Sequence, residues 1–458
     1  MNLTLYLLYI IICLKFLYPF FIRYFNFSQL PWFTIPLLIM GMFTVTYSKV
    51  YFSNEKFIFS ESKLKSYKYL FIIFLCVIFL SAFLNLNNML LVMKSLFEYS
   101  IIYIILFLAV IEMEMREKDQ ENVLKFIYAI LILQIPVTAF QYLVIGSSDA
   151  DMNGGTISDT IVGGTGIIAV LMTFLLAFAI CQILIKGINF NRIVLAIFTT
   201  IPVIAGGGRI AIILFPMTIL ISVFSVYLLK QNRKISSFIK GLLVSIVVLS
   251  LCAVILFQVI PQTKYAKFLD IKTISTVQNI EKYDKGNDWK ESRILGYYLL
   301  FNSIYKSDLN IFLGMGNEVI TSSKAAGVKQ MGIDFLVNRP DAMIFLSGTG
   351  ISGMLLVIII ILISIPTLKS HLKIETSPFM TAVAHSLIPV AFILIVALFY
   401  TQAWISHIGM IYWIMLGILF KRMSVIKRGI VLLSVYDFYK ETTPILNRNS
   451  VNTYKVQN

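Results

Sequence analysis

A chain of 458 residues that is 58% hydrophobic and only 13% charged is too apolar for a water-soluble fold, whose apolar share is about half. Its formal net charge is +15, but the Lys and Arg residues fall mostly in short segments between apolar runs, which argues against a nucleic-acid partner. The four cysteines all lie in apolar runs and suggest neither a disulfide framework nor a metal cluster. We therefore expect an all-α polytopic membrane protein without metal or cofactor.

About twelve apolar stretches could cross a bilayer as helices. Nine are expected within residues 1–260 and three within residues 342–420, and residues 421–458 are expected to form a cytoplasmic tail. The expected spans are 3–21, 30–48, 69–84, 89–111, 126–145, 161–185, 193–205, 210–229, 241–260, 342–365, 379–399 and 402–420.

One long polar interval, residues 261–341, separates the ninth expected span from the tenth. A connection of this length is usually functional or disordered. Disorder does not fit its composition, because apolar residues recur at helical spacing after Pro261 and the stretch SRILGYYLLFNSIY is amphipathic. We expect a folded cap of helices that lies on one membrane face.

The basic residues predict the orientation of the chain. Every second connection between the expected spans is rich in Lys and Arg, whereas the alternate set holds NLNN, GSSDADMNGGTISD, GGGR and the cap interval. Basic connections favour the cytoplasmic side. Both termini should therefore be cytoplasmic, and the cap should face outward.

The sharpest local motif is Ala-Gly-Gly-Gly-Arg, where Gly206, Gly207 and Gly208 precede Arg209 on the expected outward side. Glycines let the backbone approach a bound group, and freed amides beside a guanidinium suit an anion such as pyrophosphate. The alternative is an ordinary interhelical turn whose Arg reaches lipid headgroups.

Two arginines of the cap could hold the same kind of anion. Arg293 begins the second amphipathic stretch, and Arg339 lies just before Asp341 and the next span. Outward arginines beside apolar surface can bind a diphosphate through two parallel hydrogen bonds. They could equally be solvated, or paired with carboxylates of the cap.

Lys94 and Glu98 are four residues apart in an expected span and would share a helix face. Ionisable groups inside a span are costly, so this pair indicates either a substrate cavity or an internal ion pair. Lys15 in the first span is a weaker candidate, because a long Lys side chain can reach the interface. None of the three histidines lies in the cap; they are His371, His385 and His407.

Three segments resemble the O-antigen polymerase and ligase superfamily. The GGGR motif is similar to its Gly/Ser-Arg signature, and residues 292–317 resemble its Arg followed by an amphipathic helix and Gly-x-Gly. Residues 338–357, with Gly350 and Gly353, are similar to the segment that re-enters the membrane. The ligases carry a His before re-entry, where this chain has Arg339 and Asp341, so the polymerase branch is favoured.

This resemblance implies a GT-C type membrane glycosyltransferase that joins undecaprenyl-pyrophosphate-linked oligosaccharides at the outer face of the inner membrane, in O-antigen or capsule synthesis. It implies that Arg209, Arg293 and Arg339 hold the donor diphosphate, and that Asp341 orients or deprotonates the acceptor hydroxyl. Membrane lipid and a chain-length regulator are the expected partners. The alternatives are an O-antigen ligase and a lipid-linked oligosaccharide flippase, although a flippase needs no large outward cap.

Overall fold

The computed structural model describes residues 3–31, 33–53, 57, 58, 62–144, 154–157, 165–206, 210–229, 297, 300, 307–316, 340–404 and 406–427, and every regular element among them is helical. The helices are α1 (Leu3–Phe25), α2 (Thr34–Phe52), α3 (Ser62–Leu84), α4 (Met89–Ser95), the π-helix η2 (Leu96–Ile101), α5 (Ile102–Glu112), α6 (Glu117–Leu143), the 3₁₀ turn η4 (Gly155–Ile157), α7 (Thr165–Lys186), α8 (Phe190–Phe198), α9 (Thr200–Gly206), α10 (Ala211–Leu229), α15 (Asp308–Leu313), α17 (Asp341–Leu362), α18 (Ser364–Leu372), α19 (Pro378–Leu398) and a C-terminal helix, His407–Lys427.

Eight of the described helices are long and apolar enough to cross a membrane, with α17 and α18 counted as one. Three shorter apolar helices accompany them, at Ile102–Glu112, Phe190–Gly206 and Ile213–Tyr227. Only helices and closed barrels satisfy all backbone groups in lipid. The chain is therefore a polytopic helical membrane protein, while the expected span 241–260 and most of the cap interval lie outside the described residues.

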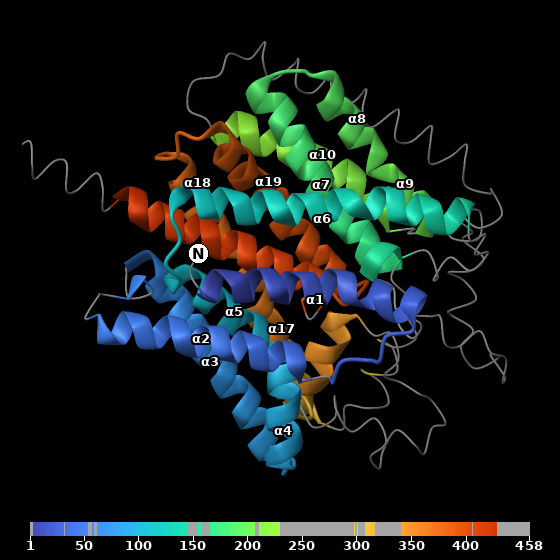
Figure 1. The fold of residues 1–458 in the computed structure, drawn as a ribbon. Coiled ribbons are helices and arrows are strands. Elements are labelled where there is room, and N and C mark those ends of the chain that lie inside the picture. Colours follow the sequence, from blue (N-terminus) through green and yellow to red (C-terminus); the bar gives the residue numbers. More distant parts are fainter. Residues whose placement is uncertain are drawn as a thin grey trace, which may run out of the picture.

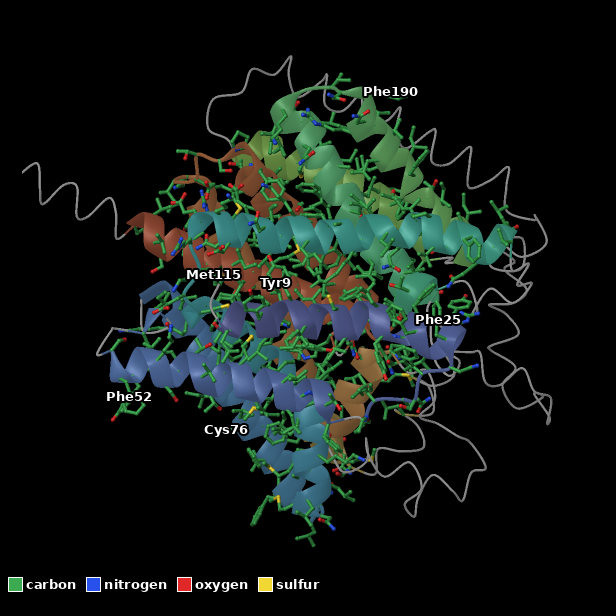
Figure 2. All side chains as sticks on the ribbon, in the orientation of Figure 1. Tyr9, Phe25, Phe52, Cys76, Met115 and Phe190 are labelled. Carbon is green, nitrogen blue, oxygen red and sulfur yellow. The ribbon has the colours of Figure 1, made fainter. Side chains whose placement is uncertain are left out.

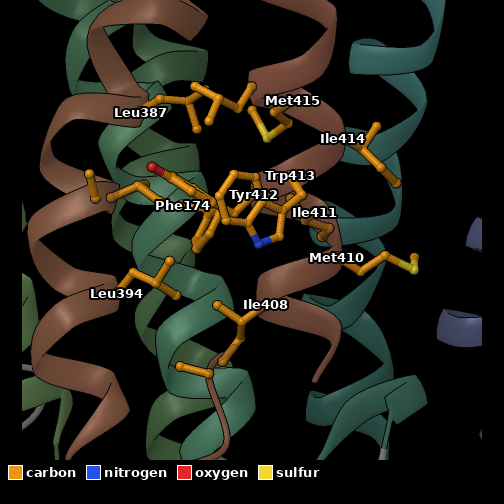
Figure 3. Packing of buried hydrophobic residues seen from close by; sticks show 14 of the residues in the cluster. Phe174, Leu387, Leu394, Ile408, Met410, Ile411, Tyr412, Trp413, Ile414 and Met415 are labelled. Atoms are coloured by element: carbon orange, nitrogen blue, oxygen red, sulfur yellow. The ribbon is translucent and has the colours of Figure 1, made fainter. Parts of the chain in front are cut away.

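Burial divides the bundle into a core and a periphery. Almost all of α7 and of the C-terminal helix is buried, whereas α1 and α2 bury less than a third of their apolar windows. Figure 3 shows how Phe174 of α7, Leu387 of α19 and Trp413 of the C-terminal helix pack together. Large side chains such as Phe25 and Phe52 project from the outer surface in Figure 2 and are exposed, as expected for residues that face lipid.

The bundle has two distinct ends. The start of α1 and the end of the C-terminal helix lie on the same side (Figure 1). We call this side the basic end, because Arg422 of the C-terminal helix contacts Glu375 there and Lys186 lines the same cavity as Glu375. The opposite side holds Asp341, where α17 begins after the polar interval, and the turn 399–406 between α19 and the C-terminal helix. We call it the loop end.

Two expected spans are interrupted where the sequence suggests single helices. Residues 89–111 comprise α4, η2 and α5, with the π-helix in the middle. Residues 193–205 are divided between α8 and α9 at Thr199, whose hydroxyl donates to the Ala196 carbonyl. Pro202 explains the second break, because it has no N–H to donate to the carbonyl of Phe198.

Candidate functional site

The helix α17 is broken close to the loop end. Gly350 has φ 65° and ψ −164°, a conformation outside the helical region that is essentially restricted to glycine. In an unbroken helix the N–H groups of Ile351 and Ser352 would donate to the carbonyls of Ser347 and Gly348. Irregular backbone at membrane depth persists where other protein groups satisfy it, so these two carbonyls need other donors.

The donors come from the turn after α15. The Met315 N–H donates to the Ser347 carbonyl at 2.8 Å, and the Gly316 N–H donates to the Gly348 carbonyl at 3.0 Å. The two backbones touch so closely that a Cβ on Gly314 would lie 2.5 Å from the Gly348 carbonyl carbon. We call this contact the glycine lock: residues 314–316 bound to the break at 348–350.

Side chains from the end of α3 and from the α3–α4 connection hold the glycine lock from the other side. Ser81 Oγ donates to the Gly348 carbonyl at 2.9 Å. The Asn85 amide donates to the Gly314 carbonyl at 3.2 Å, and the Asn87 amide donates to the Met315 carbonyl at 3.3 Å. The polar NLNN connection of the sequence thus has a definite role, which is to satisfy the carbonyls of a non-helical turn.

Asp341 lies at the start of the same helix, fully buried. Its backbone N–H donates to the Thr401 carbonyl at 3.2 Å, and its Oδ2 accepts a hydrogen bond from the Trp404 N–H. One carboxylate oxygen is thus engaged in fixing the turn 399–406. Asp341 therefore connects the broken helix to the beginning of the C-terminal helix.

A second non-helical segment docks near the loop end of α6. Gln141 donates to the Gly155 carbonyl at 2.8 Å and accepts from the Gly155 N–H at 2.9 Å. Gln134 accepts from the Thr156 N–H at 2.9 Å and donates to the Thr156 hydroxyl at 2.8 Å. These amides occupy one face of α6 and pair with the turn η4 as a neighbouring peptide would. A Cβ on Gly155 would overlap Gln134.

The structure describes part of the predicted site. Gly206 ends α9 and is buried, while Gly207, Gly208, Arg209, Arg293 and Arg339 lie outside the described residues. Ala211 begins α10 two residues after Arg209, so the GGGR motif connects α9 to α10.

The pair Lys94 and Glu98 spans the junction between α4 and the π-helix η2. Lys94 is exposed near the end of α4, and the π-helix η2 begins two residues later. A π-helix bonds residue i to i+5 instead of i+4, so the α-helical register assumed for the pair is interrupted. The side chain of Glu98 lies outside the described part of the chain.

Sequence reasoning missed a buried ionic cluster at the basic end. Arg422 donates from Nε to Glu375 Oε2 at 2.5 Å and from Nη2 to Oε1 at 3.0 Å. His371 Nε2 lies 3.4 Å from Glu375 Oε2, and Glu117 lies 3.6 Å from Arg422. The sequence places Arg422 just after the last expected span and His371 between two expected spans. His371 is in fact buried in α18.

The environment of Glu375 keeps it ionised. Burial favours the neutral acid, but the Arg422 hydrogen bonds, the Ser377 N–H and the charge of Arg422 outweigh burial and hold the pKa of the carboxyl below its usual value. A cavity of about 470 Å³ opens beside the cluster, with Lys186, Glu375, Thr381 and His385 among its lining residues. His385 Nδ1 lies 2.9 Å from the Ser225 hydroxyl.

Among the described residues, no group of three or more His, Cys, Asp or Glu side chains is arranged to hold a metal ion. No protein-family model and no curated protein matches the chain.

Proposed function

We propose that this chain is a membrane glycosyltransferase of the polysaccharide polymerase type, with a GT-C-like fold. It would join undecaprenyl-pyrophosphate-linked oligosaccharide repeat units at the outer face of a bacterial inner membrane, in O-antigen or capsule synthesis. The loop end would face outward and the basic end would face the cytoplasm.

The glycine lock is the observation that carries this proposal. Two of the three segments that resemble the polymerase and ligase superfamily contribute Gly314 and Gly316 on one side and Gly350 on the other. These segments are distant in sequence, yet their backbones hydrogen-bond directly. Asp341 begins the same helix, about two turns before this contact, so Asp341 and these glycines belong to one structural unit.

The proposed chemistry requires charge stabilisation more than a strong nucleophile. A hydroxyl of the next lipid-linked repeat unit would displace the growing chain from its lipid diphosphate, and the leaving group carries the developing charge. Arg209, Arg293 and Arg339 would hold the donor diphosphate through bidentate hydrogen bonds. Asp341 would orient the acceptor by fixing the turn 399–406.

The direct test uses the purified protein in lipid nanodiscs with a lipid-linked repeat unit as its sole substrate. Wild-type protein should produce lipid-linked dimers and longer chains. Arg209→Ala and Arg293→Ala should produce none at equal protein level, and Arg→Lys should recover only part of the rate, because Lys cannot bind bidentately. Normal polymer from both Ala variants would remove these arginines from the site, and failure of the wild-type protein with lipid-linked units of the organism's own glycan would contradict the proposal.

A further inference from the structure

The cavity at the basic end lies where three apolar helices end or begin. Its volume is about 470 Å³, and small-molecule sites usually measure about 300–1,000 Å³. Lys186 is the last residue of α7, Leu372 is the last residue of α18, and Pro378 begins α19. All three line the cavity. Because the ends of membrane-spanning helices lie at the level of the lipid headgroups, the cavity is at the depth where a headgroup is found.

The lining combines a buried part with an exposed rim. His385 is buried, whereas Lys186, Thr376 and Pro378 are exposed, so a ligand can enter from outside the protein. The other lining residues are Ile185, Leu372, Glu375 and Thr381. Since apolar side chains stand beside polar ones, the lining suits an amphiphilic ligand better than a small ion.

The carboxylate of Glu375 offers no open acceptor to a ligand in this cavity. Its Oε1 accepts from the Thr376 N–H at 3.1 Å and from the Ser377 N–H at 2.8 Å. Arg422 donates from Nη2 to Oε1 and from Nε to Oε2. A carboxylate has about four acceptor sites, and these hydrogen bonds use them. The Glu375 side chain is also shielded from solvent, and Arg422 compensates its charge.

Lys186 is the cation that faces this cavity. Its ammonium forms neither an ion pair nor a hydrogen bond with any residue that the structure describes. Thr376 adds an exposed hydroxyl beside it. The Thr381 hydroxyl donates to the Ser377 carbonyl at 2.8 Å, so its oxygen can still accept a hydrogen bond. The cavity therefore offers two donors to an anion and one acceptor to a hydroxyl.

We propose that this cavity binds the phosphodiester of an anionic lipid whose headgroup carries hydroxyl groups, as phosphatidylglycerol does. The phosphate oxygens accept from the Lys186 ammonium and the Thr376 hydroxyl. A headgroup hydroxyl donates to Thr381 Oγ1, and the acyl chains lie against the apolar side chains of the lining. Phosphatidylethanolamine fits less well, because its ammonium finds no open carboxylate and is repelled by Lys186.

The residues that follow Lys186 favour a lipid over a soluble phosphate compound. Ile188 and Phe190 are 67% and 78% exposed, and Phe190 lies at the edge of the molecule in Figure 2. Arg192 donates from Nη1 to the Gly187 carbonyl at 2.7 Å, which brings a second cation to the same connection. Anionic lipids of the cytoplasmic leaflet attract such basic groups. This site lies at the end of the bundle opposite the loop end, so the inference does not depend on which reaction the loop end performs.

Native mass spectrometry of the purified full-length protein, released from detergent micelles, measures lipid binding to single variants. With phosphatidylglycerol as the probe, Lys186→Gln should weaken binding about tenfold or more, as expected for a lost hydrogen bond from a charged group. Thr376→Ala should weaken it about fivefold. The matched control is Lys369→Gln, which removes an exposed charge of α18 outside the cavity lining and should bind as wild type does. Both lysines are exposed, so these variants should keep the wild-type melting temperature.

Two further probes distinguish the possible ligands. Phosphatidylethanolamine should bind the wild-type protein more weakly than phosphatidylglycerol. In lipid-depleted protein, phosphatidylglycerol should raise the melting temperature and inorganic phosphate should not, because phosphate leaves the apolar part of the cavity empty. A rise that requires Lys186 and occurs with phosphate but not with the lipid would overturn the lipid assignment and indicate a soluble phosphate compound. Equal affinities of Lys186→Gln and Lys369→Gln for phosphatidylglycerol, or equal wild-type affinities for the two lipids, would refute the proposal.

Discussion

Replacing Gly350 by Ala should break the glycine lock. Its φ of 65° with ψ of −164° costs a residue with a Cβ about 1–3 kcal/mol. The Cβ would also overlap the Phe312 carbonyl, and the Gly314 nitrogen would lie 2.6 Å away, so residues 314–316 must move. That movement breaks the hydrogen bonds from the Met315 and Gly316 N–H groups to α17, each of which stabilises the fold by about 1 kcal/mol. We expect a total loss of about 3–5 kcal/mol in the free energy of unfolding.

Two control glycines separate the contributions. Gly187 also has a positive φ, 89°, but a Cβ there would meet nothing within 4 Å, so Gly187→Ala should cost only the conformational part, about 1 kcal/mol. Gly41 is helical and equally open, and Gly41→Ala should be neutral or slightly stabilising. The assay is unfolding by SDS in mixed micelles. If Gly350→Ala were no less stable than Gly187→Ala, close packing of residues 314–316 on α17 would be refuted.

Three further predictions concern other parts of the molecule. Gln141→Leu should leave the Gly155 N–H and carbonyl without partners and lower the free energy of unfolding by about 2–4 kcal/mol. Limited proteolysis should then cleave the chain near Gly155 faster than in the wild-type protein, and an unchanged cleavage rate would contradict the pairing of Gln141 with Gly155. Arg422→Gln should destabilise the protein by about 3–5 kcal/mol by leaving Glu375 as an uncompensated buried charge, with Arg422→Lys intermediate. The folded pKa of Glu375 lies below its usual value, so the ionised carboxylate contributes its full stabilisation above the unfolded pKa of about 4.5 and loses it as the pH falls through the lower folded pKa. Arg422→Gln should therefore flatten the dependence of the free energy of unfolding on acid pH. An unchanged pH profile would show that Glu375 does not cause this dependence. Arg209→Ala should abolish polymer without changing the melting temperature, so a destabilised but active variant would favour a structural role.

The general architecture was predictable because lipid allows few solutions. Long apolar runs predict helices, and eight of the described helices are long and apolar enough to cross a membrane. Breaks in helices were harder to predict. Pro202 offered a signal for the α8–α9 break, but nothing local distinguishes the π-helix at Leu96–Ile101 from the α-helices on either side.

The candidate site was predictable as segments but not as contacts. Gly314, Gly316 and Gly350 stood out as family-like motifs, yet their direct hydrogen bonding depends on tertiary packing that sequence spacing cannot encode. The same limit applies to Arg422 and Glu375, which are 47 residues apart. Pro19 has no N–H for the Lys15 carbonyl, so the sequence indicates that this carbonyl needs another donor. The donor is His407, whose Nε2 lies 2.8 Å from the carbonyl oxygen, and only the packing of α1 on the C-terminal helix determines this choice.

The most direct measurement of the central claim is a gel profile of surface glycan from a strain that lacks this gene, with and without complementation. A polymerase predicts core bearing a single repeat unit, with the ladder of longer chains gone and restored by the wild-type gene. Complete absence of attached repeat units would contradict the proposal and would indicate a flippase or a ligase instead. Lipid-linked units located on the inner or outer membrane face would then distinguish these two.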